Sequence, residues 1–130
     1  MKRRWIDYAE TWTRSPMTYW VHIESSSDPT ETMPPAPASI PGKGYPVYYV
    51  EVDGFTFQFA SLDEVQVCID VLGKKLLPHT LRLARDRDAD PDEHWLRKMP
   101  ERTRPWRYRE KAVKYLEKAL AAFKKQVGGK

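Results

Sequence analysis

The sequence predicts a single α+β domain over residues 1–130, in which a small three-stranded antiparallel β-sheet packs against two main α-helices, with a short third helix. Three patterns support this fold class: a hairpin around Asp53-Gly54, a helix start at Ser61, and a long amphipathic segment near the C-terminus. A chain of 130 residues that is 41% hydrophobic can form one core.

The first predicted strand spans residues 17–24, where Tyr19, Val21 and Ile23 would share one face. Residues 25–44 are rich in Pro and Ser and predict a surface loop within the domain, because Pro cannot donate a backbone hydrogen bond. A stiff connector is favoured there over a polyproline II ligand.

The clearest local pattern is the hairpin, in which two β-rich runs, residues 47–52 and 55–59, flank Asp53-Gly54. Asp-Gly between such runs is typical of a two-residue type I′ turn. Phe55, Phe57 and Phe59 would lie on one face of the second strand, so we expect this face to be covered.

A helix is predicted directly after the hairpin, because Ser61-Leu-Asp-Glu64 fits a capping box in which each of Ser61 and Glu64 accepts from the amide of the other. Gly73 indicates where this helix ends. Its apolar stripe comprises Val65, Cys68, Ile69, Leu72 and Leu76.

The C-terminal half contains two further predicted helices, whereas residues 77–85 stay ambiguous between an extended segment and a short helix. The capping pattern of residues 90–93 predicts a short helix carrying His94, Trp95, Leu96 and Met99. Residues 103–106 lead into a long helix that ends near Val127. Its predicted buried face comprises Val113, Leu116, Leu120 and Phe123.

Charge is distributed unevenly. Residues 97–130 hold twelve Lys and Arg against three Glu, a net of +9, whereas the whole chain carries +4. The remainder therefore carries −5, and the C-terminal end is expected to attract a polyanion.

This basic, aromatic segment is the predicted binding surface of a non-enzymatic module. Guanidinium groups pair with phosphates and aromatic rings stack on unpaired bases, so nucleic acid, either DNA or RNA, is the first partner considered. An acidic protein bound through the same surface, with His94 and Trp95 as anchors, is the alternative, and an inert solvated helix face is the third. The candidate residues are Trp95, Arg97, Lys98, Arg102, Arg104, Trp106, Arg107, Arg109, Lys111, Lys114 and Lys118.

Two more specific nucleic-acid modes have less support. A helix-turn-helix would need a second helix within residues 78–87, after an unusual turn at Pro78. A sheet-based RNA binder would need an RNP-type sequence, and the run Phe55–Phe59 lacks one.

No catalytic, cofactor or metal motif stands out, so we expect no enzyme activity, cofactor or metal. The acidic run of residues 86–93 resembles a calcium loop but has Pro91 where Gly is needed and Arg97 at the twelfth position. His22, His79 and His94 are not placed by any motif, although they could converge in space.

A bacterial cytoplasmic location is expected. The single cysteine, Cys68, indicates packing rather than a disulfide. The basic N-terminus is followed by no apolar signal-peptide core, and no apolar run reaches membrane-spanning length.

The chain also resembles a group of small uncharacterised proteins carried on bacterial mobile elements. The resemblance lies in residues 59–65, the Leu77-Pro78 step, residues 94–100 and residues 106–116, and it spans about residues 45–120. It implies no activity. It does imply a cytoplasmic accessory protein, for which DNA handling or binding to a host or phage-defence protein would be natural roles.

Overall fold

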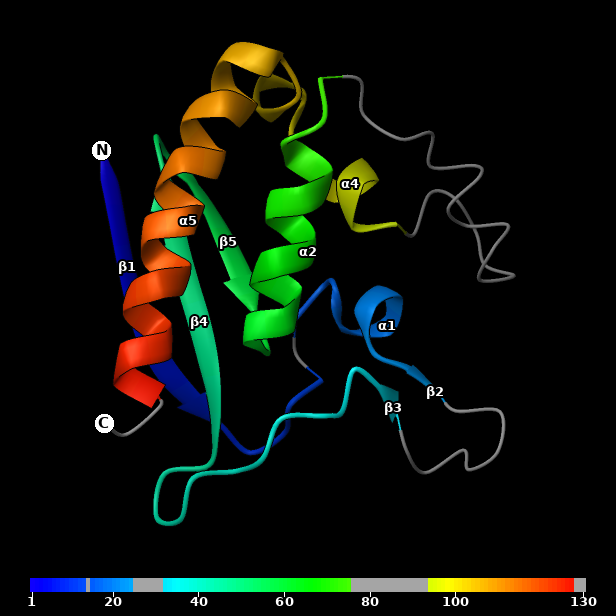
Figure 1. The fold of residues 1–130 in the computed structure, drawn as a ribbon, viewed down its shortest axis with the longest axis vertical. Coiled ribbons are helices and arrows are strands. Elements are labelled where there is room, and N and C mark those ends of the chain that lie inside the picture. Colours follow the sequence, from blue (N-terminus) through cyan, green and yellow to red (C-terminus); the bar gives the residue numbers. More distant parts are fainter. Residues whose placement is uncertain (14, 25–31, 76–93, 128–130) are drawn as a thin grey trace.

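The structure, a computed structural model, describes residues 1–13, 15–24, 32–75 and 94–127. Its main sheet is three-stranded and antiparallel, in the order β1 (Lys2–Ala9), β4 (Tyr45–Val52), β5 (Phe55–Phe59). Two long helices lie side by side over one face of this sheet (Figure 1): α2 (Leu62–Leu72) and α5 (Trp106–Val127). The predicted α+β class is confirmed.

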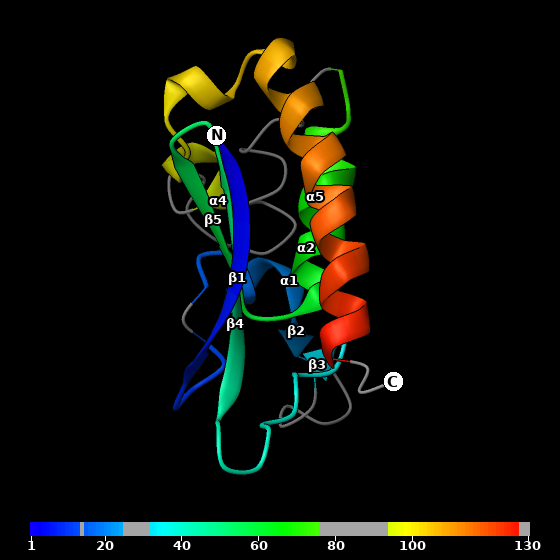
Figure 2. The same cartoon turned by 90° about the vertical axis from the view of Figure 1, so that its left-hand side faces the viewer.

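Shorter elements complete the described fold. They are the one-turn helices α1 (Thr18–Val21) and α4 (Trp95–Lys98), a 3₁₀ turn η2 (Glu101–Thr103), and a ribbon of β2 (Ile23–Glu24) with β3 (Thr32–Met33). Seen from the side, the sheet forms one layer and the α2–α5 pair the other (Figure 2).

The prediction of a strand over residues 17–24 was right only for Ile23–Glu24, which form β2, and wrong for Thr18–Val21, which form the helix α1. Met17 and Val21 are both buried while Tyr19 is 55% exposed, so the spacing of four that places two residues on one helical face outweighs the alternation of a strand. The third strand is instead β1, which pairs with β4 along its whole length. Its charged residues gave no apolar alternation to detect.

The hairpin prediction is confirmed, since Asp53 (φ 48°) and Gly54 (φ 89°) both have the positive φ that a type I′ turn requires. Phe57 and Phe59 are buried under the helices, and Phe55 packs against them at the edge of the core. The hairpin thus supplies the middle strand of the sheet and most of its apolar face.

The start of α2 is capped as predicted on one side only. The Ser61 hydroxyl accepts from the Glu64 amide at 3.2 Å, but the Glu64 carboxylate accepts from the amide of Ala60, at 3.0 Å, rather than from Ser61. The second carboxylate oxygen of Glu64 accepts from the Thr18 hydroxyl at 3.2 Å. This bond to α1 accounts for the carboxylate lying beside Ala60 instead of the Ser61 amide.

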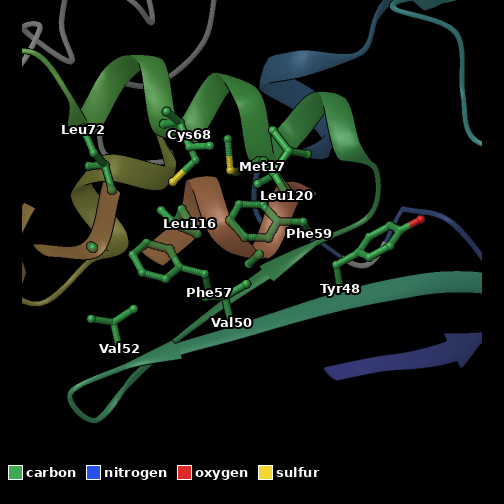
Figure 3. Packing of buried hydrophobic residues seen from close by; sticks show 14 of the residues in the cluster. Met17, Tyr48, Val50, Val52, Phe57, Phe59, Cys68, Leu72, Leu116 and Leu120 are labelled. Carbon is green, nitrogen blue, oxygen red and sulfur yellow. The ribbon is translucent and has the colours of Figure 1, made fainter. Parts of the chain in front are cut away.

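The core lies between the sheet and the helix pair (Figure 3). It includes the predicted stripe of α2 from Val65 to Leu72, in which Cys68 is fully buried. From α5 it takes Leu116, Leu120 and Phe123, as predicted, together with two alanines, whereas Val113 is only half-buried.

The helix predicted near residue 94 begins at Trp95, and His94 is its N-cap, with Nδ1 accepting from the Leu96 amide at 3.1 Å. Residues 90–93, the ambiguous segment 77–85, Leu76 and His79 lie outside the described residues. The long C-terminal helix is confirmed over Trp106–Val127.

Candidate functional site

The candidate residues predicted from the sequence do not form one surface. Trp95 is 5% exposed and Arg109 is 4% exposed, so both belong to the interior. Arg97, Lys98 and Arg102 are exposed around α4 and η2, whereas Arg104 and Trp106 are half-buried at the entrance to α5. The remaining candidates lie exposed along α5: Arg107, Lys111, Lys114 and Lys118.

Arg109 holds the end of α2. Its guanidinium donates to the carbonyls of Leu72 at 3.1 Å and Lys75 at 2.8 Å, and also to that of Lys74. Its Nε donates to the Arg104 carbonyl at 2.7 Å. A side chain whose donors satisfy the terminal carbonyls of a helix is committed to the fold and does not reach a phosphate.

Two other candidates hold the hairpin turn. Arg102 donates to the carbonyls of Asp53 and Gly54, each at 3.3 Å. Lys111 pairs with the Asp53 carboxylate at 2.6 Å, and hydrogen bonds from Lys111 and the N-terminal ammonium lower the pKa of Asp53 to about 2. Both cations thus dock α5 and η2 onto the sheet.

A stripe of exposed cations follows one side of α5. Its members recur at i, i+4, i+7, i+11 and i+18, which the helical period places on one line about 27 Å long. We call this the α5 stripe: Arg107, Lys111, Lys114, Lys118 and Lys125.

The C-terminal half of the stripe lines one side of a groove of about 920 Å³ between β1 and α5. Arg3 and Arg4 line it from the strand, and Lys118 and Lys125 line it from the helix. We call it the β1–α5 groove, lined by Arg3, Arg4, Trp5, Tyr115, Lys118, Ala121, Ala122, Lys125 and Gln126. None of these residues is acidic, so the groove carries four formal positive charges. Figure 2 shows how β1 and α5 run beside each other.

The strand wall of the groove is held in place by neighbours on β4. Arg3 pairs with Glu51, and its guanidinium lies 4.8 Å from the centre of the Trp5 ring. Trp5 in turn stacks on Tyr49, with 5.2 Å between ring centres and 11° between planes. In the described part of the chain Arg4, Lys118 and Lys125 have no ion-pair partner, so these three cations are available to an anion.

The groove opens on the free edge of β1. It touches three consecutive residues, Arg3, Arg4 and Trp5, whose side chains must alternate between the two faces of the sheet. The Asp53 amide donates to the Met1 carbonyl at 2.7 Å. In an antiparallel pair with this register, the backbone N–H and C=O groups of the odd-numbered β1 residues point towards β4. The backbone N–H and C=O of Arg4 therefore point away from β4, to the edge that no other strand of the described residues covers.

Sequence reasoning missed Arg3, Arg4, Trp5 and Lys125 as site residues. A signal was present, because a basic run followed by Trp opens the chain. It had no meaning until the fold placed β1 beside α5, more than 100 residues further along the sequence.

A second cluster of polar side chains lies at the start of α2, where Ser61, Glu64 and His22 are all buried. The His22 Nε2 atom is 2.8 Å from the Ser61 hydroxyl, and Nδ1 is 2.9 Å from the Pro34 carbonyl. Because that carbonyl can only accept, Nδ1 carries a proton and donates to it, while Nε2 and the Ser61 hydroxyl share the second hydrogen bond. Burial raises the pKa of Glu64, whose Oε2 is 3.5 Å from the same imidazole nitrogen.

The Ser61–His22 pair has the spacing of a nucleophile and its base. However, the Ser61 hydroxyl also accepts the capping bond from Glu64, and the side chain is enclosed, so substrate has no access to it in this conformation. The network ties α1 and residue 34 to α2. His94 is not part of this hydrogen-bond network; its ring contacts those of Trp20 and Trp95.

Two features are absent from the described residues: a cluster of metal ligands and a membrane-spanning helix. No group of three or more His, Cys, Asp or Glu side chains is arranged to hold a metal ion. None of the helices there is both long enough and apolar enough to span a bilayer. The acidic run of residues 86–93 lies outside this range.

Fold and groove together define a small α+β protein with a basic, partly aromatic groove between a sheet edge and a helix. Comparison with protein families, curated proteins and solved structures gave no match.

Proposed function

We propose that this protein is a nucleic-acid-binding module and that the β1–α5 groove is its binding site. The observation that carries the proposal is the convergence of Arg4, Lys118 and Lys125, without ion-pair partners in the described chain, on one groove that has no acidic lining residue. Like charges gathered in this way repel one another, and a bound polyanion would relieve the repulsion.

The α5 stripe extends the same surface. Arg107, Lys111 and Lys114 continue the line of charge from the groove towards the hairpin turn, where Lys111 also pairs with Asp53. A phosphate backbone that lay in the groove would pass along these side chains. The proposal thus keeps the exposed α5 cations of the predicted surface and leaves out Trp95 and Arg109, which are buried.

The test is a fluorescence-anisotropy titration of labelled DNA and RNA, single-stranded and duplex, against the wild type and two charge reversals. Lys118→Glu reverses a groove charge, whereas Lys124→Glu makes the same change at an exposed position about 120° further round α5, outside the groove lining. We expect Lys118→Glu to weaken binding at least about tenfold and Lys124→Glu to change it less than about twofold. Equal loss in both variants would indicate a non-specific charge effect and would contradict the proposal.

Salt gives a second readout. If a single strand contacts the four groove cations, affinity should fall roughly 50-fold between 50 and 200 mM salt, from about 0.7 counterions released per contact. Lys118→Glu should flatten this slope. A wild-type affinity that does not depend on salt would exclude phosphate contacts.

The second candidate function is an adaptor that binds an acidic protein segment, and the free edge of β1 favours it. An extended segment could pair with Arg4 through main-chain hydrogen bonds while its carboxylates meet Lys118 and Lys125. Competition by poly-glutamate against labelled nucleic acid separates the two. Poly-glutamate that binds more tightly than nucleic acid at equal charge would favour the adaptor. Either role fits a cytoplasmic accessory protein of a bacterial mobile element.

A further inference from the structure

We infer that the β1–α5 groove takes unpaired nucleotides of a single strand, and that the free edge of β1 and the ring of Tyr115 contact their bases. This inference rests on the proposed function and specifies the class of nucleic acid. Three features of the groove carry it: its size, its aromatic lining and its backbone edge.

The first feature is size. A volume of about 920 Å³ is near the upper end of the roughly 300–1,000 Å³ that encloses a drug-sized ligand. It holds a few nucleotides. A duplex keeps its bases paired and stacked, so it can offer the groove its phosphates but no unpaired bases.

The second feature is the aromatic lining. Tyr115 is half-buried and lines the groove from α5, and Trp5 lines it from β1. The Trp5 ring already stacks on Tyr49 and carries the Arg3 guanidinium, so Tyr115 is the ring that we assign to base stacking. Stacking needs bases that are not stacked on one another, which only a single strand offers.

The third feature is the backbone edge. At the free edge of β1 the Arg4 N–H is a donor and its C=O an acceptor, and in the described chain no backbone or side-chain group bonds to them. A donor and an acceptor side by side match the hydrogen-bonding edge of an unpaired base. A phosphate backbone alone would use the donor and leave the acceptor without a partner, because phosphate oxygens only accept.

The experiment compares three labelled 12-nucleotide probes of equal strand charge: a mixed-sequence single strand, the same strand with abasic sites throughout, and its duplex. We expect the single strand to bind about tenfold more tightly than the abasic strand or the duplex, which corresponds to stacking of about one base. Tyr115→Leu should remove most of the advantage of the single strand over the abasic strand, the remainder coming from the β1 edge, and should leave abasic binding unchanged. Tyr115→Phe should bind like the wild type.

The outcomes separate the inference from the proposed function. Equal affinity for all three probes would overturn the inference and leave nucleic-acid binding standing, whereas binding of none would overturn both. Tyr115 packs against the core, so circular dichroism and thermal unfolding of Tyr115→Leu are recorded beside the titration. If that variant unfolds, the abasic-strand comparison on the wild type still decides the question.

Discussion

Arg109 shows why a basic residue in a basic segment need not bind anything outside the protein. Four of its five N–H groups donate to the carbonyls of Arg104, Leu72, Lys74 and Lys75, so the side chain joins the end of α2 to the start of α5. Burial lowers the pKa of its guanidinium from the usual value, and the group nevertheless stays charged at neutral pH.

We expect Arg109→Lys to lower the free energy of unfolding by about 2 kcal/mol, because one ammonium cannot reach carbonyls arranged for a planar fork. Urea unfolding followed by tryptophan fluorescence measures this. Arg107→Lys, two residues earlier and exposed, is the control and should change stability by less than about 0.5 kcal/mol. An Arg109→Lys protein as stable as the wild type would show that the guanidinium bonds are dispensable.

The sequence does not show which of two nearby arginines is buried. The sequence shows that Arg107 and Arg109 are basic but not which one turns inwards. Helical phase alone separates them by about 200°. Only the position of α2 decides that Arg109 faces its terminal carbonyls.

Among the elements, α4 is the one whose stability should depend most directly on pH. Its N-cap is the imidazole of His94, which must be neutral at Nδ1 to accept from the Leu96 amide. Burial lowers the pKa of His94 to about 4, well below the ordinary value of 6.5. In the unfolded chain the same imidazole takes up a proton near pH 6.5.

The direction of the pH effect on stability follows from this difference between the folded and unfolded pKa values of His94. As pH falls from about 6.5 towards 4, the unfolded state binds the proton first, so the contribution of His94 to stability declines. We expect the stability of the wild type relative to His94→Asn to fall by about 2–3 kcal/mol across this window. Asn is a neutral cap of similar reach. Thermal unfolding of both proteins at several pH values checks it, and parallel curves would contradict it.

Elements specified by neighbouring residues could be predicted, and elements that depend on distant residues could not. The Asp53-Gly54 turn and the Ser61 cap rest on a few adjacent side chains; the turn formed as expected, and so did the bond from the Glu64 amide to the Ser61 hydroxyl, whereas the return bond from Ser61 to Glu64 did not. β1 did not show in the sequence, because an edge strand exposes charged residues on both faces and its residues pair with β4 residues 36 to 50 positions away. α1 was mistaken for a strand because one helical turn gives little periodic signal.

At the scale of the whole molecule, the distribution of charge in space differs from that along the chain. The sequence places a net +9 in residues 97–130 and −5 in the rest. The fold returns Arg3 and Arg4 to the basic side, beside Lys118 and Lys125, and at the same time withdraws Arg109 to the interior. The candidate site was therefore only half predictable, since α5 could be foreseen and its partner strand could not.

The fully buried thiol of Cys68 makes it possible to measure how often the sheet and the helix layer separate. This thiol lies between α2, α5 and the sheet, and burial raises its pKa, which suppresses the reactive thiolate. Because the chain has one cysteine, alkylation by a maleimide reports a single event, the separation of the two layers. We expect modification far slower than that of a free thiol and accelerated in Arg109→Lys, and mass spectrometry over time would measure it. A rate equal to that of a free thiol would mean that the two layers part readily under native conditions.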